Sequence, residues 1–166
     1  MSPLNIIDLY EYSRTVRRRF ANKLSDLSWE EAAKNREASF YSMKNILLHM
    51  IDNEDWIVNY AIFEKSKEYS RRSSDYYTSM SMILEHLSEV EKKTLDYFSK
   101  VTVEELRGMV DFELSSGKKF DMTVEECLFQ SFTEQLYHLG ELICLLWQDN
   151  IEPPPMQWFY NRPSRV

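Results

Sequence analysis

The sequence contains little glycine and little cysteine. Three glycines among 166 residues are too few for a turn-rich β protein, and this scarcity favours long helices. The two cysteines, Cys127 and Cys144, match neither a disulfide framework nor a CxxC metal motif. They lie seventeen residues apart on one expected helix, where their sulfur atoms cannot meet. We therefore expect reduced thiols and a cytoplasmic protein.

The sequence also lacks an excess of basic residues and any long apolar run. Its formal charge of −7 disfavours nonspecific binding to nucleic acid. The first residues do not form the apolar stretch of a signal peptide, and no segment is long and apolar enough to span a membrane. Two short basic runs, Arg17–Arg19 and Arg71–Arg72, are interpreted as a solvated helix face and a polar loop. The alternative is a patch for an anionic substrate, and Arg17 itself falls near the apolar stripe of the first helix.

What the sequence does contain is helical periodicity. Its length predicts one domain over residues 1–166. Long helices are expected at about 5–24, 39–64, 75–100 and 123–149, with a short extra helix at 29–35. Two alternating runs around a Ser-Gly turn, near 109–122, predict a small hairpin or extended loop before the last helix. The prolines at 153–155 end helical structure, and the aromatic tail after them is expected to pack back on the body. The predicted fold is an all-α four-helix bundle.

Three potential metal ligands fall on two of the expected helices. Glu134 and His138 are four residues apart, which places both side chains on one helix face. His49 lies far upstream on another helix, three residues before Asp52. One carboxylate and two imidazoles are ligands of reactive zinc sites, where three protein ligands leave positions for water or substrate. The sequence therefore suggests a divalent metal site of His49, Glu134 and His138, with Asp52 as a neighbouring acceptor or base.

The same residues also fit a plainer interpretation. Glu134 and His138 would then be a surface pair and His49 a satisfied core histidine, because such pairs arise by chance in acidic helical proteins. The third histidine, His86, is expected to be structural or on the surface, with a role as fourth ligand as the alternative. Cys127, two turns before Glu134, is expected to be a small buried residue.

Three stretches of the sequence together resemble one known family. In Leu47–Trp56 a histidine follows apolar residues and precedes acidic residues and an aromatic. In Glu134–Trp147 the pattern is a ligand-type residue, His138, then glycine, then an acidic residue and an apolar run. The double proline Pro153-Pro154 follows that helix. These stretches are similar to the second helix, the last helix and the helix exit of the DinB-like (DinB/YfiT) family, and the resemblance covers nearly the whole chain.

The resemblance implies a divalent metal ion, often zinc or nickel, held by three histidines. His49 and His138 occupy two of these positions, and Glu134 stands where the family has its other histidine. A carboxylate remains a competent ligand but shifts the preference toward zinc, manganese or iron(II). We therefore expect zinc or nickel as the cofactor, with manganese or iron as alternatives. Glu141 matches the glutamine that follows the family's glycine.

Characterised members of this family include S-transferases and isomerases that use low-molecular-weight thiols. The resemblance therefore implies a metal-dependent enzyme of the thiol S-transferase type, in which Asp52 or Glu141 orients the substrate or accepts a proton. A metal-dependent hydrolase that activates water is one alternative. A non-catalytic helical module is another. Family members often pair through helix faces, so a homodimer is expected, with a small molecule as partner and no contact to DNA or membrane.

Overall fold

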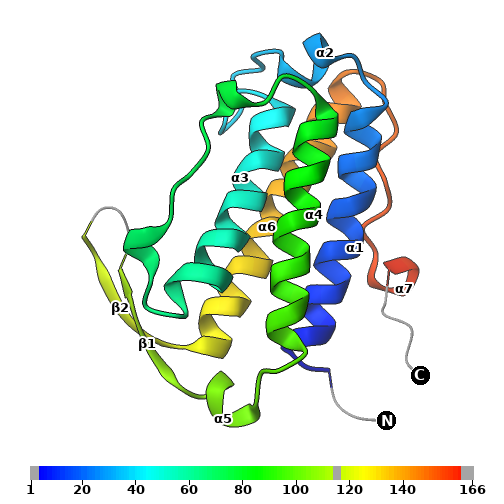
Figure 1. Ribbon diagram of the computed structural model, residues 1–166. Helices are drawn as coiled ribbons and strands as arrows, with labels where there is room; N and C mark the ends of the chain where they lie inside the picture. The colour runs from blue at the N-terminus through cyan, green and yellow to red at the C-terminus, as the bar shows by residue number, and fades with distance from the viewer. Residues whose placement is uncertain (1–3, 114–116, 162–166) are drawn as a thin grey trace.

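Four long helices lie side by side and form a bundle (Figure 1). The computed structural model describes residues 4–113 and 117–161. The bundle consists of α1 (Ile6–Ser25), α3 (Met43–Trp56), α4 (Met80–Phe98) and α6 (Val124–Gln148). The all-α four-helix bundle that the sequence predicts is confirmed.

Short helical segments connect or extend the long ones. The helix α2 (Trp29–Ala33) confirms the short extra helix predicted near 29–35. Between α3 and α4 a long connection runs along the side of the bundle (Figure 1). The remaining short segments are the π-helical turn η1 (Ile57–Ala61), the 3-10 turns η2 (Ser66–Glu68) and η3 (Ser74–Tyr76), and the helices α5 (Val103–Leu106) and α7 (Trp158–Asn161).

A two-stranded antiparallel hairpin precedes α6, as predicted. It consists of β1 (Met109–Glu113) and β2 (Lys119–Thr123), and Val110 pairs with Met122 in its register. Val110 is buried, so the hairpin contributes to the core at the end of the bundle near α5 (Figure 1). Residues 114–116 of the predicted turn lie outside the described residues.

The start of α6 is fixed by a capping box. The Thr123 hydroxyl accepts a hydrogen bond from the N–H of Glu126, and the Glu126 carboxylate accepts one from the N–H of Thr123. Two N–H groups that would otherwise lack partners are satisfied in this way. Because the strand β2 runs directly into this cap, the box fixes where the helix that carries Glu134 and His138 begins.

The helix α3 begins later than the sequence predicts. Ser42 caps it by accepting a hydrogen bond from the N–H of Asn45, and the helix starts at Met43. Tyr41 has a φ of 68°, a left-handed conformation that no right-handed helix can include. The predicted start near residue 39 is therefore wrong. Residues 39–41 belong to the loop before the helix. The helix α4 likewise starts five residues later than predicted, behind its own serine cap.

Apolar side chains fill the bundle in two clusters. One cluster includes Phe20 and Leu146, and reaches toward α2. The other includes the rings of Tyr10, Phe98 and Phe132, whose centroids lie 5.0–6.1 Å apart. These helices hold together because each contributes one apolar face to this interior.

Arg17 is fully buried among the four helices. Its Nη1 donates to Glu54 of α3 at 2.5 Å and to Gln135 of α6 at 3.0 Å, and its Nη2 donates to Glu91 of α4 at 3.2 Å. The interpretation of this basic run as a solvated face is therefore wrong at Arg17, although it holds for the exposed Arg19. Because Arg17 lies on the apolar stripe of α1, its guanidinium is buried inside the bundle. There it forms ion pairs with two carboxylates, those of Glu54 and Glu91.

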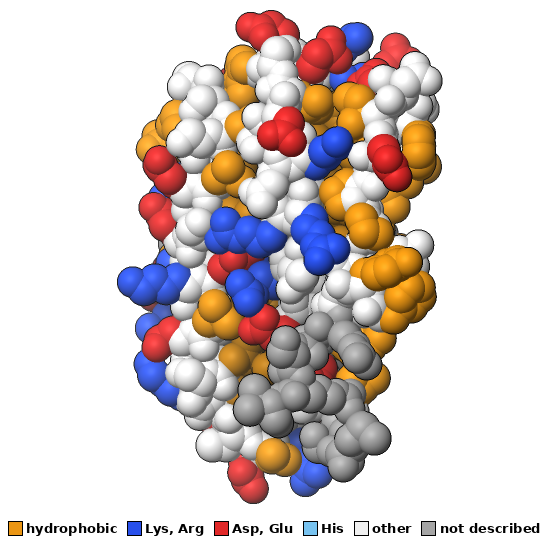
Figure 2. Space-filling model, turned by 90° about the vertical axis from the view of Figure 1, so that its right-hand side faces the viewer, with side chains coloured by type: hydrophobic (Ala, Val, Ile, Leu, Met, Phe, Trp, Pro, Cys, Tyr) orange, Lys and Arg blue, Asp and Glu red, His pale blue; other side chains and the backbone are white. Residues whose placement is uncertain are grey.

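The C-terminal tail packs against α1, as predicted. The rings of Trp158 and Tyr12 lie 5.1 Å apart, and the Tyr12 hydroxyl donates to the carbonyl of Met156. Phe159 and Tyr160 remain exposed. Figure 2 views the molecule from this side and shows basic side chains gathered across the middle of the face, with acidic ones close by. Among the described residues, none of the helices combines the length and the apolar character needed to cross a membrane.

Candidate metal centre

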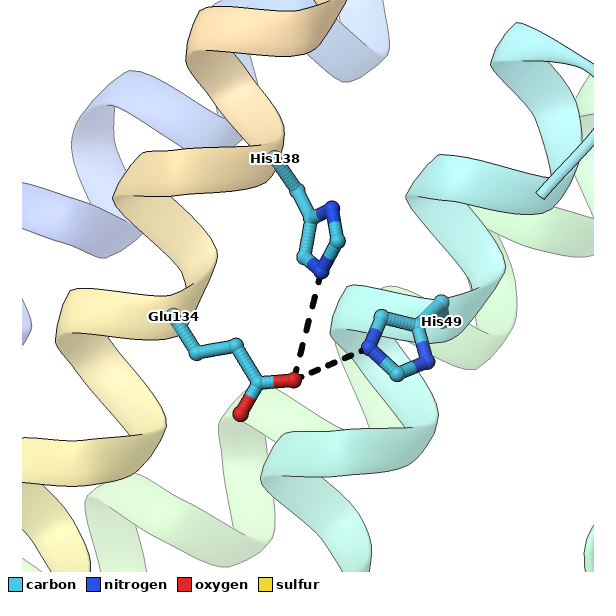
Figure 3. Close-up of side chains that lie close together, drawn as sticks. All are labelled: His49, Glu134 and His138. Atoms are coloured by element: carbon cyan, nitrogen blue, oxygen red, sulfur yellow. Dashed lines mark hydrogen bonds and ion pairs between the residues drawn. The ribbon is translucent and has the colours of Figure 1, made fainter. Parts of the chain in front are cut away.

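The centre is built first from one face of α6. Glu134 and His138 lie one turn apart, and the Nε2 of His138 is 3.9 Å from the Oε1 of Glu134. Figure 3 shows that both side chains point from α6 toward α3. The four-residue spacing in the sequence predicts this shared face, because it corresponds to about one helical turn.

The neighbouring helix α3 supplies the third side chain. The Nε2 of His49 lies 3.1 Å from the Oε1 of Glu134, and the ring centroids of His49 and His138 are 4.8 Å apart (Figure 3). The three ligand atoms of His49, Glu134 and His138 all lie within 4.8 Å of one another. Within the described part of the chain, no other cluster of three or more His, Cys, Asp or Glu side chains could hold a metal ion.

The donor set of this cluster fits a divalent ion. Zinc binds imidazole nitrogen and carboxylate oxygen at about 2.0–2.2 Å, so its ligand atoms lie up to roughly 4 Å apart around one ion. The observed separations meet this limit after side-chain movements of about 1 Å, which rotamer adjustments supply. The side chains of His49, Glu134 and His138 are 20%, 28% and 16% exposed, so the cluster is reachable from solvent.

Glu134 carries the negative charge that such a cluster requires. Hydrogen bonding with His49 lowers the pKa of Glu134 below its usual range, although burial acts in the opposite direction. Gln130, one turn earlier on α6, donates to its other carboxylate oxygen. Glu134 is therefore ionised at neutral pH and available as a ligand.

Glu141 holds His138 from the far side of the ring. Its Oε2 lies 3.3 Å from the Nδ1 of His138, and it accepts hydrogen bonds from the N–H and the hydroxyl of Ser39 at 2.8 and 2.7 Å. A proton on Nδ1 leaves the lone pair of Nε2 facing Glu134, which is the tautomer that binds a metal. Burial alone would raise the pKa of Glu141, but these hydrogen bonds bring it below its usual range.

Phe40 covers the centre from the loop before α3. Its ring stacks on His49 at 4.0 Å and meets His138 edge-on at 5.3 Å. The loop is held by two residues in left-handed conformations, Glu37 and Tyr41. The sequence interpretation missed Phe40 because it extended the helix through residue 40, and the signal that would have shown otherwise is the capping position of a serine at 42.

The structure does not bring Asp52 into this cluster. Its carboxylate accepts a hydrogen bond from the Nε of Arg71 at 2.6 Å and one from the Tyr69 hydroxyl at 3.3 Å. Asp52 is largely buried, and burial raises its pKa although Arg71 lowers it. The proximity of Asp52 to His49 in the sequence thus does not place the two in one group.

Two other residues also stand outside the cluster. His86 is buried, and its Nδ1 lies 2.6 Å from the Tyr77 hydroxyl, in agreement with a structural role. Burial lowers the pKa of His86. Cys127 is buried, as predicted, and burial raises the pKa of its thiol to about 11. A thiol with so high a pKa is a poor nucleophile at neutral pH.

Comparisons with known proteins agree with this picture of the fold. The DinB family model matches residues 1–163. The crystal structure of a DinB-like protein from Bacillus cereus is similar with a TM-score of 0.69 and 17% identity, covering 90% of this chain and 94% of that one. A DinB-like protein from Bacillus subtilis is similar with a TM-score of 0.68 and 15% identity, covering 91% and 98%. At these identities the two structures show a common fold. No match was found among curated proteins.

Proposed function

Because the chain belongs to the DinB family, we propose that His49, Glu134 and His138 hold one divalent metal ion and that the protein is a metal-dependent enzyme. The observation that carries this proposal is the approach of three ligand atoms, from two helices, to within 4.8 Å of one another. Side chains 85 residues apart in sequence meet there. Zinc or nickel is the proposed ion, with manganese or iron(II) as alternatives because Glu134 is an oxygen ligand.

The proposed reaction is transfer of a low-molecular-weight thiol to an electrophile. A divalent ion supplies a Lewis acid that lowers the pKa of a coordinated thiol or water. Three protein ligands leave room for such a group. The thiol sulfur forms a bond to the electrophilic carbon, the leaving group departs with its electron pair, and the thiol proton passes to solvent or to a nearby base.

The residues around the cluster have distinct tasks in this proposal. Glu134 offsets part of the positive charge of the ion. Glu141 keeps His138 in the ligating tautomer and orientation. Phe40 excludes water from the face of His49 on which it stacks. Asp52, which is paired with Arg71, is not assigned to proton transfer in this proposal.

A metal-dependent hydrolase is the alternative within the same chemistry. The cluster would then activate water rather than a thiol. Thiol dependence separates the two reactions, because hydrolysis proceeds without a thiol. A non-catalytic helical module is the third candidate, and in that case the double variant His49→Ala/His138→Ala would leave the function of the protein in its cell unchanged.

Metal analysis of the full-length protein tests the proposal. The protein is purified without chelators or an affinity tag, and its metal content is measured before and after equilibration with micromolar zinc, nickel or manganese. We expect one ion per chain in the wild type and in Glu125→Gln, an exposed position on the same helix. We expect none in His49→Ala/His138→Ala. Wild-type protein that stays free of all three metals would refute the proposed centre.

Thiol consumption tests the reaction. The metal-loaded protein is mixed with a thiol and 1-chloro-2,4-dinitrobenzene, and formation of the thioether is followed by absorbance. Rates should fall to the uncatalysed level in His49→Ala/His138→Ala. A metal-loaded wild type that hydrolyses esters without any thiol, and does not accelerate thioether formation, would favour the hydrolase instead.

A further inference from the structure

A groove of about 470 Å³ lies beside the metal centre. One wall is the middle of α3 with the loop before it, and the other is the segment that leads into η3. Its volume falls within the roughly 300–1,000 Å³ of small-molecule sites. The residues that line the groove are Phe40, Tyr41, Asn45, Leu48, Asp52, Arg71, Arg72, Ser73 and Ser74.

Phe40 connects the groove with the centre. It lines the groove, and its ring stacks on His49 at 4.0 Å. On α3, the groove residue Leu48 directly precedes His49, and the groove residue Asp52 follows it by three positions. Three residues advance about 4.5 Å along a helix. A molecule in the groove therefore lies within about one helical turn of a proposed ligand.

Arg71 lines this groove, and its guanidinium is paired through one nitrogen only. Its Nε donates to the Oδ2 of Asp52 at 2.6 Å, and this is the one hydrogen bond that Arg71 makes within the described residues. The Asp52 side chain is 8% exposed, whereas that of Arg71 is 54% exposed. The pair of Nη atoms is thus left for a ligand, and this fork matches the two oxygens of a carboxylate.

Each arginine of the groove lining is paired with one carboxylate, and the two pairs differ in where that carboxylate lies. Arg72 is a second arginine in its lining, and its Nη2 donates to Glu89 on α4 at 3.1 Å. Asp52 is the only carboxylate among the lining residues, and it is already paired with Arg71. Because Glu89 pairs with Arg72 and Asp52 binds only the Nε of Arg71, the Nη atoms of Arg71 are the cationic donors left to favour an anionic ligand.

We propose that this groove binds a carboxylate group of the thiol co-substrate through the Nη atoms of Arg71. The identity of the ligand as the thiol rests on the proposed function, whereas the carboxylate preference rests on the groove itself. Thiols built from cysteine and further amino acids carry carboxylates several bonds away from the sulfur. Such a molecule can place its sulfur toward the centre and its carboxylate toward Arg71.

The experiment compares two probes that share a thiol and differ in their carboxylates, glutathione and its diethyl ester. Binding to chelator-treated, full-length protein is measured by titration while the arginine Nε–H signals are followed by nuclear magnetic resonance. We expect the wild type to bind glutathione about tenfold more tightly than the ester, the discrimination of one charge-assisted hydrogen-bonded pair. We expect Arg71→Gln to bind both alike. Equal binding of both probes by the wild type would overturn the proposal.

Two further variants make the result decisive. Arg19→Gln, an exposed position on α1, should keep the tenfold discrimination, and loss of discrimination there would overturn the role of Arg71. Arg71→Lys keeps a positive charge beside Asp52 but lacks the fork, so it decides the question if Arg71→Gln fails to fold. Loss of discrimination in Arg71→Lys supports the proposal, and undiminished discrimination overturns it.

This experiment is independent of the metal. Because the protein is metal-free in the titration, a failure of the proposed centre leaves the groove measurement intact. The converse outcome is that metal-loaded protein consumes glutathione and its ester at equal rates and with equal KM. That result would agree with the proposed function and would overturn only the proposed carboxylate binding in the groove.

Discussion

Glu134 is the residue by which this chain departs from the three-histidine ligand set that the sequence resemblance implies. Its Oε1 lies 3.1 Å from one histidine and 3.9 Å from the other, so it occupies the middle of the cluster. A carboxylate contributes a negative charge there that an imidazole does not, and it favours harder ions than a set of three imidazoles does. The ionisation of this side chain is therefore the property on which the proposed metal affinity depends.

Replacement of Glu134 by glutamine should lower the affinity for zinc by about 100-fold. A four-ligand zinc site contributes roughly 10–16 kcal/mol of binding, so one ligand contributes about 3 kcal/mol. Glu134→His should keep affinity and move the preference from manganese toward nickel. Competition with a chromophoric chelator measures both effects, with Glu125→Gln as the exposed control on the same helix. Unchanged affinity in Glu134→Gln would remove this residue from the ligand set.

Acid should destabilise the metal-free protein through Glu134 and Glu141. The pKa of each is lowered from its usual value of 4.5, so both bind protons less readily in the folded state than in the unfolded state. Their contribution is fully present above pH 4.5 and is lost as the pH falls through the lowered values. Urea unfolding between pH 3 and 7 should therefore show a smaller acid loss in the double variant Glu134→Gln/Glu141→Gln than in the wild type. Equal losses would contradict the assignment.

At the scale of elements, the centre depends on the register of two helices and one loop. The capping box at Thr123 fixes α6, and Ser42 fixes α3. The loop before α3 is tied to α6 because Ser39 donates twice to Glu141. This tie places Phe40 over His49. A helix boundary that differs from the predicted one by a single turn thus decides whether the centre has a cover.

Ser42→Ala tests the role of this helix start. Loss of an N-cap serine costs about 0.5–2 kcal/mol of unfolding free energy. We expect a loss in that range by urea denaturation, because Ser42 is buried and accepts from the N–H of Asn45 at 3.2 Å. The control is Ser99→Ala, at the exposed C-terminal end of α4, which should change stability by less than about 0.5 kcal/mol. Equal effects of both variants would show that the cap is not needed.

At the scale of the molecule, the buried network of Arg17 connects all four long helices. Arg17 lies on α1, and it donates to Glu54 on α3, Glu91 on α4 and Gln135 on α6. The Glu54 carboxylate also accepts from Thr94 on α4. Buried charges are costly unless paired, so the four helices must meet in an arrangement that brings both carboxylates to Arg17, although its Nε remains without a hydrogen-bond partner among the described residues.

Arg17→Ala should strongly destabilise the protein. It leaves Glu54 buried without its cation, and breaking a buried pair in this way costs about 3–5 kcal/mol. The free energy of unfolding of a small protein is only about 5–15 kcal/mol. The midpoint of thermal or urea unfolding should therefore fall markedly. Arg19→Ala, an exposed neighbour on the same helix, should change stability by no more than about 0.5 kcal/mol. A small effect of Arg17→Ala would show that the network contributes little to stability.

Much of the secondary structure could be predicted from the spacing of residues that are close together in the sequence. The periodicity of apolar residues predicted the four long helices, and alternation with a turn predicted the hairpin, since both patterns report on neighbours within a few residues. The start of the last helix near residue 123 was predicted for the same reason. The start of α3 was predicted wrongly, because two serines, Ser39 and Ser42, lie near it and the choice between them depends on what the preceding loop contacts.

The sequence by itself determined that Glu134 and His138 share a helix face, because that follows from the pitch of an α-helix. Only the tertiary structure decided that His49 meets them, since a contact across 85 residues depends on how α3 packs against α6. The tertiary structure also decided that Asp52 pairs with Arg71 and that Arg17 is buried. In each case the partner lies on another segment of the chain, and the packing of the whole bundle decides which partner comes within reach.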